Sequence, residues 1–141
     1  MDIQTRILTS LTTSAPAVAR ATRAASWPRT IAGLPDAFGA NLVNTVRASL
    51  RIGGYEIPPM ALEVAALAEM REARAYDGVE LALIVAALAE CGIIAPARLV
   101  GACVVGATAG GSSIRAPAGA WSMILDSPID ATIYTGPGSL P

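Results

Sequence analysis

Alanine is the residue type that most constrains how this chain can fold. It occurs 29 times in 141 residues, whereas aromatic residues make up only 4% of the sequence. A core of small side chains lets helices approach closely, but each contact removes little apolar area from water, at about 25 cal/mol per Å². Because 53% of the residues are hydrophobic, we expect one folded domain that also buries apolar surface against another copy, a partner protein or a membrane.

Charged residues are scarce and unevenly distributed. They make up 15% of the chain, and the formal net charge is −1. These values exclude disorder of the whole chain and argue against a general nucleic-acid-binding protein. Residues 1–51 carry a local net charge of +4 and residues 52–90 carry −5. Neighbouring copies can therefore attract each other head to tail, or the same charges can pair within one molecule.

The sequence contains neither histidine nor lysine, since all ten basic residues are arginine. This removes the usual general base, the commonest metal ligand and the catalytic amine. Glycines at 101 and 106 have the spacing of a phosphate-binding P-loop, but Ala107 stands where that loop needs lysine. Cys91 and Cys103 have no metal-binding or redox spacing, and we expect them to be buried. We therefore predict no enzymatic activity, no cofactor and no metal site.

Apolar spacing and helix-boundary residues predict a mainly α fold. We expect a bundle of about five short helices with an N-terminal arm and a small C-terminal β-hairpin. The predicted domain limits are 1–35 for the helical arm, 36–111 for the bundle core and 112–141 for a loop, the hairpin and a tail. Helical signals cover residues 3–11, 15–25, 36–52, 58–75, 78–91 and 96–109, and the two hairpin strands are expected at 120–125 and 129–134.

A short internal repeat lies within the predicted bundle. Residues 61–69 read ALEVAALAE and residues 82–90 read ALIVAALAE, so eight of the nine positions are identical. Two copies are too few for a solenoid. We expect them instead to form an antiparallel helical hairpin around the turn at Asp77–Gly78, with similar alanine and leucine faces in contact.

Two groups of residues are candidates for binding. Small residues four positions apart predict a groove along the last helix, where a second backbone can approach closely; with the aromatic residues of the hairpin, they give the candidate interface residues Ala102, Gly106, Gly110, Trp121 and Tyr134. Four arginines in a segment without acidic residues are candidate phosphate contacts for a nucleic acid bound by the arm, namely Arg6, Arg20, Arg23 and Arg29.

These features favour a non-enzymatic structural subunit that assembles into a homo-oligomer, as a component of a shell, virion or connector, with other structural subunits as further partners. No secretory signal is seen, which favours the cytoplasm or an assembled particle, although an arginine-containing, acid-poor start also suits a targeting segment. The alternative is a small membrane-associated protein that uses residues 79–109. The apolar run at 81–95 is, however, shorter than the roughly 20 residues that a spanning helix needs.

A third alternative comes from Gly106-Ala-Thr-Ala-Gly110-Gly111. This segment resembles the double-glycine end of leader segments in precursors of ribosomally made, modified peptides. The resemblance covers about six residues and implies cleavage after Gly111. The residues just upstream lack the acidic character of such leaders, and glycines that end a helix explain the same sequence.

Overall fold

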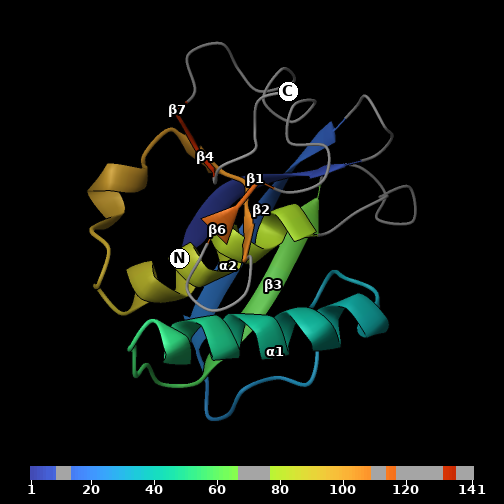
Figure 1. Ribbon diagram of the computed structural model, residues 1–141, viewed down its shortest axis with the longest axis vertical. Coiled ribbons are helices and arrows are strands. Elements are labelled where there is room, and N and C mark those ends of the chain that lie inside the picture. The colour runs from blue at the N-terminus through green and yellow to red at the C-terminus, as the bar shows by residue number, and fades with distance from the viewer. Residues whose placement is uncertain (9–13, 67–76, 109–113, 117–131, 136–141) are drawn as a thin grey trace.

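A five-stranded mixed β-sheet, rather than a helical bundle, forms the centre of the molecule (Figure 1). The computed structural model describes residues 1–8, 14–66, 77–108, 114–116 and 132–135. The strand order is β3-β2-β1-β4-β7, and β5 and β6 form a separate two-stranded sheet. The strands are β1 (Asp2–Leu8), β2 (Ser14–Arg23), β3 (Met60–Ala66), β4 (Ala102–Val104), β5 (Ala107–Thr108), β6 (Ile114–Arg115) and β7 (Thr132–Tyr134).

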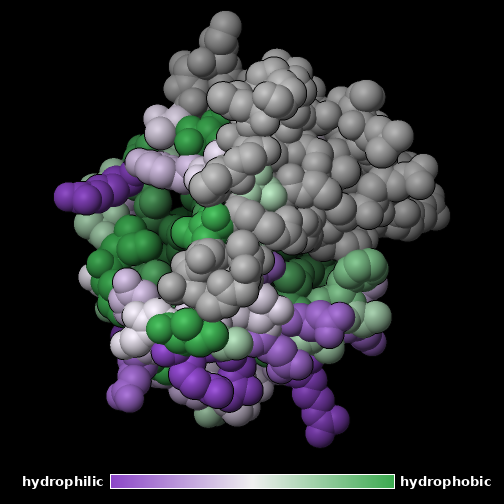
Figure 2. Space-filling model, viewed as in Figure 1, coloured by the Kyte–Doolittle hydropathy of each residue, from purple (hydrophilic) through white to green (hydrophobic). Residues whose placement is uncertain are grey.

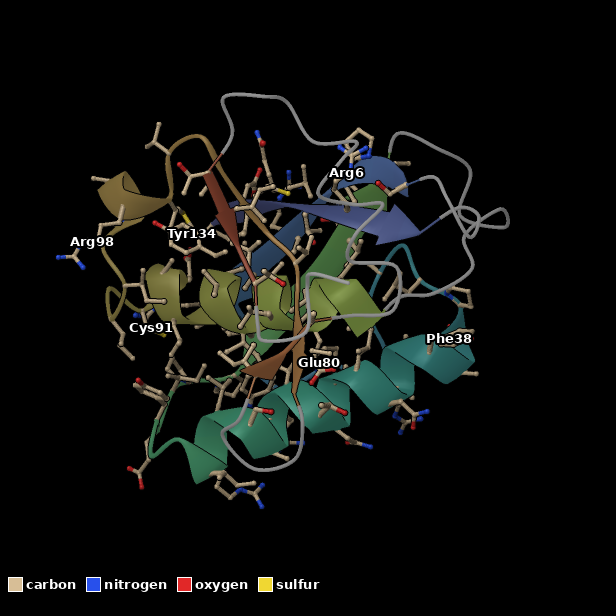
Figure 3. All side chains as sticks on the ribbon, turned by 45° about the horizontal axis from the view of Figure 1, so that its top comes forward. Arg6, Phe38, Glu80, Cys91, Arg98 and Tyr134 are labelled. Carbon is tan, nitrogen blue, oxygen red and sulfur yellow. The ribbon has the colours of Figure 1, made fainter. Side chains whose placement is uncertain are left out.

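Two α-helices, α1 (Asp36–Ile52) and α2 (Glu80–Glu90), lie side by side against one face of this sheet (Figures 1 and 3). α2 packs most extensively on β2, where Ala17, Ala19 and Ala21 are at most 4% exposed. Three fully buried alanines of α2 belong to the same core, namely Ala82, Ala86 and Ala87. The high alanine content is therefore used for close packing of a helix on a sheet.

The predicted N-terminal helical arm is wrong, because β1 and β2 are internal strands of the sheet. They pair antiparallel, with Asp2 beside Arg20 and Leu8 beside Ser14. Ile3 and Ile7 are four residues apart, which suits one face of a helix and equally one face of a strand. Thr5 is buried together with Ile3 and Ile7, so every second residue faces the core, whereas Asp2 and Gln4 are exposed. The alternation holds from Asp2 to Thr5, whereas Arg6 is also buried. The antiparallel pairing with β2 along the whole segment makes it a strand.

The predicted helical hairpin of residues 61–69 and 82–90 is also wrong. Residues 61–66 lie in β3 and residues 82–87 lie in α2, although five of these six positions are identical. In β3, Leu62 and Val64 are buried while Glu63 faces solvent. In α2 the same residue types belong to a longer apolar run, and residues on several sides of this helix are buried. Tertiary packing overrides the local preference of this alanine-rich segment.

The α-helix predicted over residues 96–109 is wrong, because residues 96–108 form a short turn and strands. The predicted groove of small residues along that helix is therefore wrong as well. A 3₁₀ turn, η3 (Pro96–Leu99), is followed by β4 and β5. Gly101 has a φ of +72°, a left-handed conformation that ends the turn and is accessible mainly to glycine. The β-branched residues that follow, Val104 and Val105, favour the extended backbone of a strand.

Two predicted helices are confirmed, and the predicted hairpin is not. α1 begins at Asp36 as expected and ends before Gly53, and α2 occupies most of residues 78–91 before Gly92. A second 3₁₀ turn, η2 (Asp77–Val79), precedes α2. In the C-terminal region, β7 pairs in parallel with β4, with Thr132 beside Ala102. The other expected hairpin strand, 120–125, lies outside the described residues.

Candidate functional site

The sheet face opposite the helices carries a row of charged side chains across three neighbouring strands. Arg20 of β2 donates to Asp2 of β1 from Nε at 2.7 Å and from Nη2 at 3.0 Å, and it donates from Nη1 to Glu63 of β3 at 3.3 Å. The hydrogen bonds from Arg20 hold the pKa of Asp2 below its ordinary value. These exposed ion pairs match the strand register, which places Asp2, Arg20 and Glu63 beside one another.

The four arginines predicted to contact phosphate occupy different parts of the structure. Arg6 is only 8% exposed, and its guanidinium donates to the Oγ atom and the carbonyl oxygen of Ser14. Arg6 and Arg20 lie toward opposite ends of the β1–β2 pair. Arg23 is exposed at the end of β2, and Arg29 is exposed in the segment before α1. A nucleic-acid contact by these residues stays a prediction.

The candidate interface residues are similarly divided. Ala102 and Gly106 are buried, and a Cβ atom on Gly106 would lie 2.8 Å from Leu81 Cδ2 of α2. Tyr134 of β7 is 47% exposed and is therefore accessible to a partner. Gly110 and Trp121 lie outside the described residues. Of the two cysteines, Cys103 is buried and Cys91 is partly buried. Both positions are consistent with a packing role for a small apolar side chain.

The segment that joins α2 to β4 exposes apolar side chains. This α2–β4 crossover, residues 91–101, contains a single charged residue, Arg98. Val100 is 83% exposed and Ile93 is 48% exposed. Figure 2 shows hydrophobic surface on the side of the molecule where η3 lies in Figure 1, and Figure 3 shows Arg98 pointing away from the body of the protein. Exposed apolar residues grouped in one segment mark a candidate contact surface.

A hollow of about 220 Å³ lies beside the crossover, at the start of β1. Leu99, Val100 and Gly101 line one side of it, and Met1, Asp2 and Gln4 line the other. Met1 and Leu99 are partly buried and pack on the main core. Val100, the next residue after Leu99, is exposed.

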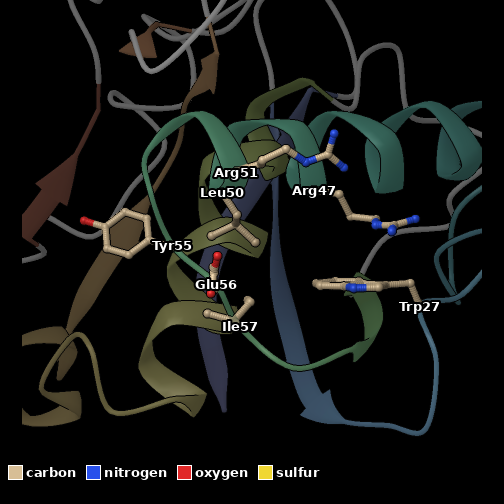
Figure 4. A pocket seen from close by; sticks show the side chains of 7 residues that line it. All are labelled: Trp27, Arg47, Leu50, Arg51, Tyr55, Glu56 and Ile57. Carbon is tan, nitrogen blue, oxygen red and sulfur yellow. The ribbon is translucent and has the colours of Figure 1, made fainter.

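A second hollow, here called the Trp27 pocket, has a volume of about 400 Å³ (Figure 4). Trp27 comes from the segment after β2, and Arg47 and Arg51 come from the last turns of α1. The Arg47 Cζ atom lies 5.5 Å from the centre of the Trp27 ring, within the range of a cation–π contact. The remaining lining residues are Leu50, Tyr55, Glu56 and Ile57.

The end of α1 explains how this pocket forms. Gly53 and Gly54 stop the helix, and Gly54 has a φ of +83°. The chain then turns back, and the Tyr55 amide donates to the Leu50 carbonyl oxygen at 2.9 Å. This turn brings residues 55–57 beneath the end of α1. Sequence reasoning missed the pocket, because Arg47 and Arg51 entered that reasoning only through the net charge of residues 1–51. Their spacing of four places them on one side of a helix but does not show that Trp27 and Tyr55 lie beside them.

Two classes of site have no example in the part of the chain that the structure describes. No group of three or more Cys, Asp or Glu side chains there is arranged to hold a metal ion. None of the helices described combines the length and apolar character needed to cross a membrane.

No protein-family model matches the chain, and no curated protein matches it.

Proposed function

We propose that the protein is a non-enzymatic structural subunit that associates with further copies of itself, as a component of a shell, virion or connector. The observation that carries this proposal is the apolar, exposed α2–β4 crossover. Val100 exposes 83% of its surface, and one charged residue occurs in the segment of residues 91–101. Burying a valine side chain contributes about 1.5–3 kcal/mol, so a surface of this kind favours association.

A second copy is the occupant that the chain's own charges favour. Residues 1–51 carry a net charge of +4 and residues 52–90 carry −5. Part of this charge is paired within one molecule, by Arg20 with Glu63 and by the N-terminal amine with Glu90. The charge that remains can attract a second copy before the apolar surfaces meet. Tyr134 adds an exposed aromatic ring on β7, the strand next to β4. Aromatic side chains are enriched in protein interfaces.

The test is the Val100→Asp variant, measured by light scattering across a range of concentrations. The proposal expects the wild type to scatter as a multiple of 14.3 kDa and the variant to shift strongly toward 14.3 kDa, because a carboxylate would be buried in the contact. Phe38→Asp is the matched control: Phe38 is 50% exposed and lies at the opposite end of the molecule from Arg98 (Figure 3).

The control variant should keep the wild-type mass. A contact through the crossover would be contradicted if Val100→Asp also kept the wild-type mass, or if Val100→Asp and Phe38→Asp dissociated to the same extent.

A further inference from the structure

The Trp27 pocket combines a size and a lining that suit a small organic ligand. Its volume of about 400 Å³ falls within the range of roughly 300–1,000 Å³ seen in small-molecule sites. Ile57 supplies aliphatic surface, and Trp27 and Tyr55 supply aromatic surface. Leu50 also lines the pocket, but it belongs to the main core and is only 3% exposed. The pocket is open to solvent, since Arg47, Arg51, Tyr55 and Glu56 are all exposed. A ligand here would therefore rest one face on the apolar side chains and be oriented by the charged groups.

The charged groups at this pocket are mainly cationic. Arg47 and Arg51 are four residues apart on α1, so they project from the same side of the helix. Figure 4 shows both side chains extending toward the same side of the pocket, with the Arg47 guanidinium next to Trp27. Among the described residues, the ion pairs within 4.0 Å involve neither of these arginines.

The contact with Trp27 prepares Arg47 for binding. A guanidinium stacked on an indole ring loses less rotamer freedom when it donates to a ligand, because its position is already restricted. Each guanidinium presents paired N–H donors that match the geometry of a carboxylate or a phosphate. Like charges at this spacing also repel each other by about 0.2–0.5 kcal/mol, and a bound anion relieves that repulsion.

Glu56 limits the charge that the pocket favours. Its carboxylate is part of the lining and lies between Leu50 and Ile57 in Figure 4, away from the guanidiniums. The lining therefore carries two positive charges and one negative charge, which favours a ligand with one anionic group at the arginine side and an uncharged body toward the aliphatic side.

We propose that the Trp27 pocket binds a small aromatic molecule that carries an oxyanion, with Arg47 and Arg51 holding the oxyanion and the aromatic body lying against Leu50, Tyr55 and Ile57. This site lies within one copy of the chain. It is therefore independent of the proposed self-association, and either can fail without the other.

The test is calorimetric titration of the full chain with four probes of similar size. Benzoate and phenyl phosphate carry the two kinds of oxyanion, whereas benzyl alcohol is neutral and benzylammonium is cationic. The proposal expects saturable heat with at least one of the two anions, and the tighter of the two identifies the preferred oxyanion. It expects weaker or no binding of the neutral and cationic probes.

Two variants of the pocket test the role of charge, one that removes a positive charge and one that removes the negative charge. Arg51→Gln should weaken anion binding about tenfold, the usual effect of losing a charged hydrogen bond. Glu56→Gln should tighten it, because a repelling carboxylate is removed. Arg98→Gln is the control for a general loss of positive charge and should bind like the wild type, since Arg98 lies in the crossover and does not line this pocket.

A fluorescence readout locates the binding. In a Trp121→Phe protein, Trp27 is the sole tryptophan, and an anion bound beside it should change its emission with the same dissociation constant as the heat. The wild-type calorimetry still decides if that variant does not fold. Absence of saturable heat with both anions, equal affinity for benzyl alcohol, or equal losses in Arg51→Gln and Arg98→Gln would overturn the proposal.

Discussion

Thr5 of β1 is buried on the helix-covered face of the sheet, between Ile3 and Ile7. It is 2% exposed, and its Oγ1 atom has no hydrogen-bond partner among the described residues. A buried hydroxyl without a partner costs about 1–3 kcal/mol of stability. We therefore expect Thr5→Val, which keeps the shape of the side chain, to stabilise the protein by roughly 1 kcal/mol in a urea titration.

The matched control is Thr22→Val on β2, because Thr22 is exposed and on a neighbouring strand. The control should leave the urea midpoint nearly unchanged. A Thr5→Val protein that is less stable than the wild type would show that this hydroxyl is hydrogen-bonded in solution.

Asp2 links the stability of the sheet to pH. The hydrogen bonds from Arg20 lower its pKa in the folded state below the ordinary value of 3.8. Its contribution is therefore fully present above that value and is lost as the pH falls through the lower folded-state pKa. We expect Asp2→Asn to be slightly less stable than the wild type at neutral pH, and the difference to disappear in strong acid.

Urea titrations from neutral pH to about pH 2 measure this difference. High salt should shrink it at neutral pH as well, because both side chains are about half exposed and their attraction is screened. A difference that grows on acidification would mean that Asp2 is destabilising when charged.

At the scale of elements, β3 is the end strand of the sheet, and a loop covers part of its outer edge. The Ala32 amide donates to the Leu62 carbonyl oxygen at 3.2 Å, and the Val64 amide donates to the Ala32 carbonyl oxygen at 2.9 Å. Gly33 makes this contact possible, since its φ is +92° and a Cβ atom there would overlap the Val64 carbonyl oxygen. The loop limits pairing of this edge with other chains.

Gly33→Ala should therefore be more damaging than an alanine at another left-handed glycine. Gly54 has a φ of +83° and open space around it, so we expect Gly54→Ala to lose about 1–2 kcal/mol from the backbone conformation alone. We expect Gly33→Ala to lose clearly more and to aggregate more readily, as measured by urea midpoints and turbidity. Equal midpoints for the two variants would contradict the tight contact between this loop and β3.

The limits of sequence-based prediction are also clearest at this scale. α1 was predictable, because Asp36 and Gly53 mark its boundaries and its apolar residues recur at helical spacing. α2 was predictable as a continuous apolar run between Glu80 and Glu90 that ends before Gly92. β3 was not, because residues 61–66 almost repeat a helical segment and only the pairing with β2 makes them a strand. β1 was missed because Ile3 and Ile7 satisfy both periods.

The candidate site was even less predictable from sequence. Trp27, Arg47 and Tyr55 come from three separate segments, and only the turn after α1 brings them to one pocket. Each residue alone has an ordinary explanation: a helix-ending Trp-Pro pair, an exposed arginine and a residue after a glycine turn. Tyr134 lies in β7 and is exposed, whereas its contact with a partner stays a prediction.

For the whole molecule, helices cover one face of the sheet, and the opposite face is crossed by the charged row of Asp2, Arg20 and Glu63. The crossover exposes Val100, the most exposed of the large apolar side chains described, together with Ile93, next to the hollow at the start of β1. Other exposed large apolar side chains lie elsewhere, at Phe38, Ile52, Tyr55, Ile114 and Tyr134. We propose that the crossover end of the molecule makes the contact with another copy and that the charged row lies outside this contact.

Native mass spectrometry of the wild-type protein at micromolar concentration tests this central claim most directly. Self-association through the exposed crossover predicts a discrete species whose mass is a whole-number multiple of 14.3 kDa. A spectrum that contains only the 14.3 kDa monomer across the micromolar range would contradict it.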